Sequence, residues 1–142
     1  MLEMYARGVR FAFVVDPKNI HKDIAPGMVA TIADNGTVKT CTDKDLPAGF
    51  FLTEYFDEFP KHKKCIFWTD RVVLSIGPNR FETDEHEPGK YHINDLLYCS
   101  PNGKVTNDKR YKGNYIIGIV CSVKKNKIGF IHILTRYIEE KI

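Results

Sequence analysis

Turn-forming residues recur along the whole chain and leave only short runs between them. These turn signals are Pro26-Gly27, Asn35-Gly36, Pro47-Ala48-Gly49, Gly77-Pro78-Asn79, Pro88-Gly89, Pro101-Asn102-Gly103, Lys112-Gly113-Asn114 and Lys125-Asn126-Lys127. Pro removes a backbone donor, whereas Gly and Asn tolerate positive φ, so each group interrupts a strand or a helix. Isolated helices need longer uninterrupted runs. The pattern therefore predicts an all-β chain with little helix.

The runs between these turns are rich in Val, Ile, Phe, Tyr and Thr, which suit a pleated, half-buried surface. About nine short antiparallel strands are expected from them. They are Val9–Val15, Met28–Ile32, Thr37–Cys41, Phe50–Thr53, Cys65–Thr69, Val72–Ile76, Asp95–Cys99, Ile116–Val123 and Ile128–Leu134. Only Leu52–Phe59 and Thr135–Ile142 are free enough of Gly and Pro to form a short helix.

Two of these runs have a distinctive pattern. In Val9–Val15 every second residue is apolar, so Val9, Phe11, Phe13 and Val15 share one face. The run Ile116–Val123 is almost wholly apolar, as expected for a central strand that is covered on both faces. The polar connection Lys124–Lys127 links it to Ile128–Leu134 and predicts a C-terminal hairpin in which Asn126 can adopt positive φ.

A weak internal repeat links two parts of the chain. Gly27–Val38 aligns with Asp95–Val105 with one gap, and both read strand, Asn-Gly turn, strand. A return strand follows each of them, at Pro47–Leu52 and at Asn114–Ile119. Two related hairpin units could close one small β-barrel or sandwich. The alternative is that Asn-Gly hairpins are simply common in β proteins.

Length and composition indicate one folded β domain. The chain has 142 residues, 43% hydrophobic and 27% charged, with a formal net charge of +3. This length is that of a single ordinary domain, and the composition is that of globular chains. We expect a single β domain over residues 1–142, with an extended N-terminal arm at residues 1–8. Residues 54–87 form a middle segment that resembles an insertion.

No targeting or membrane segment is evident. The N-terminus lacks the apolar stretch of a signal peptide, and no window approaches the roughly 20 apolar residues that span a bilayer. The cysteines Cys41, Cys65, Cys99 and Cys121 are scattered among apolar neighbours without a CxxC pair. They are expected to be buried free thiols in a protein that is made in a reducing cytosol.

The residues with reactive side chains do not form a recognisable catalytic or metal-binding set. His62 and Cys65 have a ligand-like spacing, but no second pair completes a zinc site. The stretch Glu82–Gly89 is expected to be a solvated acidic loop. His132 alternates with Phe130 inside a strand, which predicts a partly buried histidine. No phosphate-binding glycine motif or nucleophile motif is present. The sequence therefore predicts a non-enzymatic protein without a metal or a cofactor.

Aromatic and basic residues are interleaved in Lys61–Trp68 and in Arg110-Tyr111-Lys112, a pattern that can bind single-stranded nucleic acid by stacking and phosphate attraction. Against this interpretation, acidic residues flank the first of these segments, at Asp57, Glu58 and Asp70. An OB-like module that binds single-stranded nucleic acid is retained as an alternative, and nucleic acid is not the expected partner.

The strongest suggestion of a function comes from a resemblance. Ile24–Lys39 followed by Leu46–Leu52 has a strand, an Asn-Gly hairpin and a return strand that begins with Pro and Gly. The stretch Pro88–Val105 followed by Ile117–Val120 has the same arrangement. This pattern resembles the head-decoration and related virion structural proteins of tailed bacteriophages.

The resemblance implies a β-barrel or sandwich that binds the capsid and has no catalytic residues. The expected partner is the major capsid protein, the expected location is the capsid surface of the virion, and a homo-oligomer or symmetric array on the particle is expected. Synthesis would take place in the host cytoplasm. Another phage component, from the tail or neck, is the alternative within this class.

The N-terminal region supplies the candidate contact residues. Protein interfaces are enriched in aromatic residues and Arg, which Tyr5, Arg7, Arg10 and Phe11 provide. We expect these four residues to bind the partner, from an arm that becomes ordered on docking. The alternative is that Val9–Val15 is simply the first core strand.

Overall fold

The computed structural model describes residues 2–4, 9–15, 24–52, 71–77, 79–111 and 114–136. The strands are β1 (Leu2–Met4), β2 (Val9–Val14), β3 (Val29–Ile32), β4 (Val38–Thr40), β5 (Gly49–Phe51), β6 (Arg71–Ile76), β7 (Asn79–Thr83), β8 (Leu96–Cys99), β9 (Val105–Thr106), β10 (Tyr115–Val123) and β11 (Ile128–Arg136). Within the described ranges, the helical structure is one 3-10 turn, η2 (Lys109–Tyr111). The expected all-β class with little helix is therefore confirmed.

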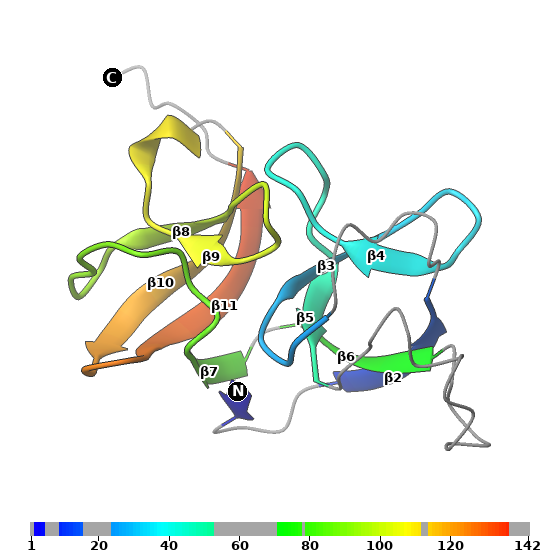
Figure 1. The fold of residues 1–142 in the computed structure, drawn as a ribbon, viewed down its shortest axis with the longest axis horizontal. Coiled ribbons are helices and arrows are strands. Elements are labelled where there is room, and N and C mark those ends of the chain that lie inside the picture. The colour runs from blue at the N-terminus through cyan, green and yellow to red at the C-terminus, as the bar shows by residue number, and fades with distance from the viewer. Residues whose placement is uncertain are drawn as a thin grey trace.

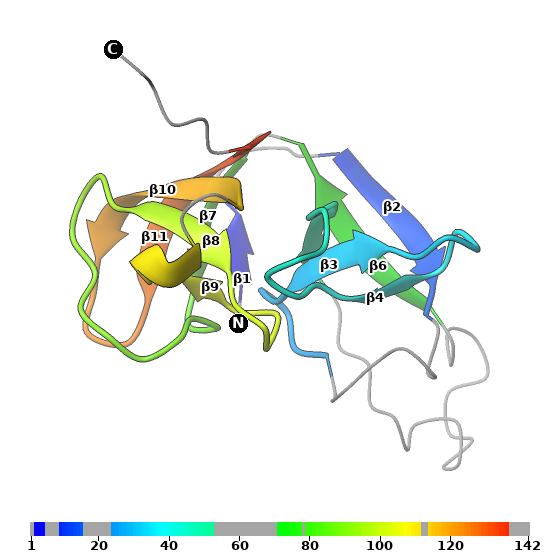
Figure 2. The ribbon, with the colours of Figure 1, turned by 90° about the horizontal axis from the view of Figure 1, so that it is seen from above.

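The strands form two antiparallel sheets. One sheet has the order β2-β6-β5-β3-β4, and the other has the order β1-β7-β11-β10-β8-β9. Figures 1 and 2 show these sheets side by side, with β2 to β6 on one side of the molecule and β7 to β11 on the other. We call β2 to β6 the first unit and β7 to β11 the second unit.

The two units have the same strand connectivity. If the five strands of each unit are numbered 1 to 5 along the chain, their spatial order in both sheets is 1-5-4-2-3. Strand β1 pairs with β7 and adds a sixth strand at that edge of the second sheet. In each unit an isolated parallel bridge joins a residue beyond the end of the first strand to the third strand, at Val15–Val38 and at His86–Val105. The two sheets therefore share this bridge as well as their strand order.

The hairpins at the centre of the predicted repeat match in detail. The N–H of Gly36 donates to the carbonyl of Ala33 at 2.9 Å, and the N–H of Gly103 donates to the carbonyl of Ser100 at 3.1 Å. Gly36 and Gly103 have φ values of 82° and 76°, which L side chains rarely adopt. The two related hairpin units expected from the sequence are thus present as β3–β4 and β8–β9.

The return strands also match, through a glycine in each. Gly49 of β5 lies opposite Ala30 of β3, and Gly118 of β10 lies opposite Leu97 of β8. A Cβ on Gly49 would meet the carbonyl oxygen of Ser75 in β6, and a Cβ on Gly118 would lie 3.0 Å from that of Ile131 in β11. A close approach of neighbouring strands therefore requires glycine at the same place in both units.

The cores of the two sheets are joined through Phe50 of β5. Its ring lies 5.0 Å from the ring of Phe81, 5.3 Å from that of Phe130 and 4.8 Å from that of His132, all in the second unit. These are the distances of favourable aromatic pairs, each contributing roughly 1 kcal/mol beyond area burial. A second cluster is built from the first unit and contains Val15, Ile24, Met28, Ala30, Val38, Phe51, Val72 and Leu74.

Most predicted strands are confirmed with small changes at their ends, and so is the C-terminal hairpin of β10 and β11. The predicted strand Cys65–Thr69 lies outside the described residues. Asn126 does not use positive φ there; among the described non-glycine residues only Asn94 does. Strand β10 lies between β8 and β11 as expected, but both of its faces are covered only near Ile116–Gly118, and Val123 is exposed.

Strands β1 and β7 were not predicted, whereas β9 is the second strand of the hairpin expected over Asp95–Val105. The expectation of a solvated loop at Glu82–Gly89 is wrong at its start, because Glu82 lies in β7 and is buried. Its carboxylate accepts from Lys124 Nζ at 2.8 Å and pairs with Lys127 Nζ at 3.3 Å. Two lysines from the β10–β11 turn therefore compensate the charge.

Several expectations fall partly outside the described residues. The cysteine expectation holds for Cys41 and Cys99, which are buried free thiols, and Cys121 is half-buried, whereas Cys65 lies outside. In residues 54–87 the described part contributes β6 and β7 to the sheets. In the arm, residues 2–4 form β1, and residues 5–8 lie outside. Of the two short helices, only Leu52 and residues 135–136 are described, and residues 135–136 belong to β11.

Candidate docking site

Strand β2 forms one edge of the first unit. It pairs with β6 along its whole length, from Val9 opposite Ile76 to Val14 opposite Arg71. Among the described residues, no strand lies along its other edge, which is joined to the sheet only by the Val15–Val38 bridge beyond its end. An edge of this kind presents backbone donors and acceptors to a possible partner strand.

The side chains of β2 pass from the core into solvent along the strand. Val15, just past its end, is buried, Phe13 is half-buried against the first-unit core, and Phe11 is 51% exposed. The rings of Phe11 and Phe13 meet edge to face with centroids 6.4 Å apart. On the opposite face Val14 is 37% exposed, and Ala12 is also exposed. The apolar surface of the core therefore continues outward over β2.

Two of the four predicted contact residues lie on this strand. Arg10 and Phe11 are both exposed, so they are available to a partner. Tyr5 and Arg7 lie outside the described residues. Val14 was not singled out from the sequence, because it falls on the opposite face of the alternating pattern. The core-strand alternative also holds in part, since Phe13 packs on the core.

The second unit repeats the Arg-Phe pair of β2 in β7. Phe11 lies opposite Leu74 in β6, and Phe81 lies opposite Phe130 in β11. Leu74 pairs with Phe51, two residues after Gly49. Phe130 pairs with Val120, two residues after Gly118, so Leu74 and Phe130 occupy equivalent positions. By this register Arg10-Phe11 occupies the place of Arg80-Phe81.

The two copies of this pair have opposite environments. Phe81 is fully buried among Phe50, Phe130 and His132, whereas half of Phe11 is exposed. The outer edge of β7 is covered by β1, with Met4 opposite Phe81. The edge that β1 covers in the second unit is therefore open in the described part of the first unit. We call the edge of β2 with Arg10, Phe11, Ala12 and Val14 the β2 edge.

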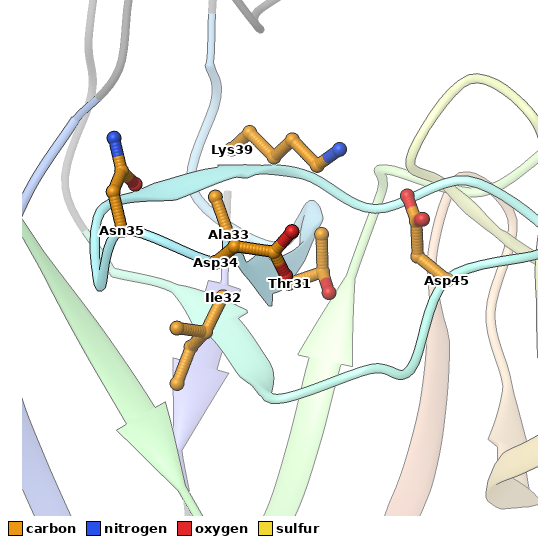
Figure 3. Close-up of a pocket in the computed structure, with 7 residues that line it drawn as sticks. All are labelled: Thr31, Ile32, Ala33, Asp34, Asn35, Lys39 and Asp45. Carbon is orange, nitrogen blue, oxygen red and sulfur yellow. The ribbon is translucent and has the colours of Figure 1, made fainter.

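The hollow shown in Figure 3 lies beside the β3–β4 hairpin and has a volume of about 420 Å³. Its lining residues are Thr31, Ile32, Ala33, Asp34, Asn35, Lys39 and Asp45. Asp45 Oδ2 accepts from the N–H and the hydroxyl of Thr42 at 3.1 and 3.0 Å. The Thr31 hydroxyl donates to the carbonyl of Leu46 at 2.7 Å. These groups hold the loop together and do not form a catalytic arrangement.

A second hollow, of about 550 Å³, lies in the second unit beside β8. Asn107 Nδ2 donates to Asp95 Oδ2 at 2.9 Å and to the carbonyl of Lys90 at 2.7 Å. Burial raises the pKa of Asp95, but hydrogen bonds from Asn107 and His92 outweigh it, and the pKa lies below the ordinary value. The carboxylate is therefore an ionised structural acceptor for its own loops.

Three titratable side chains with shifted pKa values are packing residues. Burial lowers the pKa of His132, opposed by its hydrogen bond to the carbonyl of Gly77. A hydrogen bond with Cys41 and then burial raise the pKa of Cys99. Burial raises the pKa of Tyr91 to about 12, and its hydroxyl donates to the carbonyl of Glu87 at 2.6 Å. His132 was expected to be partly buried; it is 4% exposed, so its burial is more complete than expected.

Within the described ranges, no group of three or more His, Cys, Asp or Glu side chains is placed to hold a metal ion. In the same residues, no helix is long and apolar enough to cross a membrane. No protein-family model matches the chain, and no curated protein matches it in sequence. The function proposed for the β2 edge therefore rests on the residues of this chain alone.

Proposed function

We propose that this chain is a non-enzymatic virion structural protein of a tailed bacteriophage. It decorates or stabilises the capsid by binding the major capsid protein through the β2 edge, and it forms a symmetric array on the capsid surface. The observation that carries the proposal is the exposed Arg10-Phe11 pair on a strand edge that is open among the described residues, whereas its counterpart in the second unit is covered by β1.

The chemistry of the β2 edge suits a protein partner. Phe11 is a large apolar side chain that is half exposed, and Arg10, on the opposite face of the same strand, supplies a charge that can form directed hydrogen bonds. Aromatic residues and Arg are enriched among the residues that contribute most to protein interfaces. Phe13 packs on the core, and its ring contacts that of Phe11 edge to face. A partner would thus meet a supported aromatic anchor.

The nucleic-acid alternative gains little from the described residues. In Arg110-Tyr111, the guanidinium of Arg110 lies 2.8 Å from the carboxylate of Asp108 and 5.7 Å from the Tyr111 ring centroid. The guanidinium of Arg110 is therefore paired with an acid of the same loop. Lys112 and the Lys61–Trp68 segment lie outside the described residues.

The test is co-sedimentation of the purified protein with tailed-phage capsids that lack it, followed by cryo-electron microscopy of the pellet. We expect regular density on the shell in contact with β2. Phe11→Ser should weaken binding at least tenfold, as expected for a central aromatic anchor. Ile93→Ser is the matched control, because Ile93 is 55% exposed in the second unit, and it should bind like the wild type.

Protein that stays in the supernatant would contradict the capsid role. If native particles then carry the protein on the tail or neck, the alternative within the virion class replaces it. Absence from particles altogether would contradict both and would direct attention to oligonucleotide binding, for which a steep salt dependence is the signature.

A further inference from the structure

We propose that the β2 edge binds its partner by accepting an extended strand over Phe11–Phe13, antiparallel to β2, in the position that β1 takes on β7. The inference rests on the proposed docking function and specifies how the partner binds. The occupant is a segment of the partner protein that reads apolar, acidic, apolar from its N-terminal end.

The register of β1 on β7 defines the position of that strand. Leu2 pairs with Thr83, Glu3 with Glu82 and Met4 with Phe81. The equivalents of these β7 residues in β2 are Phe13, Ala12 and Phe11, because Phe81 and Phe11 occupy the same place opposite β11 and β6. A strand in the same register would therefore lie along Phe11–Phe13.

The backbone of β2 is suited to this pairing. It is already in extended conformation, since it forms an unbroken six-residue ladder with β6. Adding a strand to a formed edge requires no rearrangement of the acceptor, and the main-chain hydrogen bonds supply the affinity. The bridge from Val15 to Val38 holds the end of the strand to β4, as the bridge from His86 to Val105 does in the second unit.

The side chains of β2 define the chemistry of the occupant. Apolar residues opposite Phe11 and Phe13 would cover the half-exposed aromatic surface. The residue opposite Ala12 would share its face with Arg10, because residues two apart on a strand point the same way. Ala12 is small and exposed, which leaves an acidic side chain free to reach the guanidinium of Arg10 diagonally.

The first experiment uses a peptide with the sequence of residues 1–6, Met-Leu-Glu-Met-Tyr-Ala, as the probe, because β1 already fits the equivalent edge. It is titrated into the full-length, 15N-labelled protein, and amide shifts are followed by NMR. We expect saturable shifts in Phe11–Phe13 and antiparallel intermolecular contacts between backbone protons. Shifts confined to β7, where the peptide would exchange with β1, would overturn the inference.

A charge exchange tests the acidic position. Arg10→Glu should weaken binding of the peptide about threefold, which is typical for the loss of one cross-strand charge pair. A peptide with Lys in place of its Glu should then bind the Arg10→Glu protein better than it binds the wild type. Equal binding in all four combinations would overturn the assignment of an acidic residue.

A variant of the edge separates the mode of binding from the docking function. Ala12→Glu places a like charge directly opposite the acidic residue of the occupant and should weaken peptide pairing, because like charges directly opposite across strands are destabilising. Val123→Glu, at an exposed position beside the β10–β11 turn, is the matched control and should have no effect. If Ala12→Glu still binds capsids and the peptide like the wild type, strand addition in this register is wrong although docking stands. If the peptide pairs with β2 but the protein does not bind capsids, the proposed function is wrong and the strand-accepting edge stands.

Discussion

Asn94 occupies the position in the second unit that Gly27 occupies in the first. Both have positive φ, 73° for Asn94 and 100° for Gly27. The backbone N–H of each donates at 2.8 Å to a carbonyl of the return strand, that of Val120 for Asn94 and that of Phe51 for Gly27. The turns that lead into β3 and β8 are therefore built alike, on a residue that tolerates left-handed backbone.

Asn94→Gly should leave the free energy of unfolding within about 0.5 kcal/mol of the wild type, whereas Asn94→Ala should lower it by about 1 kcal/mol. Asn and Gly populate the left-handed region, and Ala pays a steric penalty there. Urea denaturation of the three proteins measures the difference. Equal stability of the Ala and Gly variants would contradict the role of the backbone conformation.

Gly49→Ala and Gly118→Ala should each destabilise the protein by about 2 kcal/mol, as overpacking typically does. The new Cβ on Gly49 would meet the carbonyl of Ser75, and that on Gly118 would lie 2.8 Å from the Phe130 ring. Gly77→Ala is the control, because its Cβ would meet no atom within 4 Å, although its φ is 94°. It should cost about 1 kcal/mol. Thermal or urea unfolding of all three variants tests whether Gly49→Ala and Gly118→Ala lose more stability than Gly77→Ala.

Protein stability should decrease as the pH falls below about 6.5, the usual pKa of an unfolded-state histidine. Burial lowers the pKa of His132 in the folded protein, so the unfolded chain binds its proton more readily. The contribution is fully present above the unfolded pKa and is lost as the imidazole is protonated at lower pH. It is measured as the free energy of unfolding between about pH 5 and 8, the range in which His titrates.

His132→Phe should flatten this pH dependence, because it removes the titrating group. His92→Gln should retain it, since the His92 side chain is 73% exposed. An unchanged slope in His132→Phe would show that another group is responsible.

Replacing both Lys124 and Lys127 by Met should lower the free energy of unfolding by about 3 kcal/mol, because a buried charge that loses its partners is costly. Glu82 is 2% exposed, and both ammonium groups lie within 3.3 Å of its Oε1. Lys125→Met, from the same turn, should change stability by less than about 0.5 kcal/mol, as surface substitutions usually do. A double variant as stable as Lys125→Met would contradict the role of these ion pairs.

The hairpins could be predicted from the sequence because their signals are local. Asn35-Gly36 and Asn102-Gly103 each place a glycine at the turn position that has positive φ, and alternating apolar residues flank them. By contrast β7 contains Asn79, Arg80 and Glu82, which oppose a strand assignment. Its buried glutamate is compensated by lysines more than 40 positions later, so the neighbouring residues carry no sign of it.

The sequence by itself determined the all-β class and the hairpin turns, and it places the same dipeptide, Arg-Phe, at residues 10–11 and 80–81. Only the tertiary structure decided which of these phenylalanines is buried. Phe11 and Phe81 each follow an arginine and occupy equivalent strand positions. Phe81 nevertheless packs against Phe50 and its strand is covered by β1, whereas Phe11 is half exposed. The burial of a side chain depends on which strands and rings pack against it, and those contacts come from residues far away in the chain.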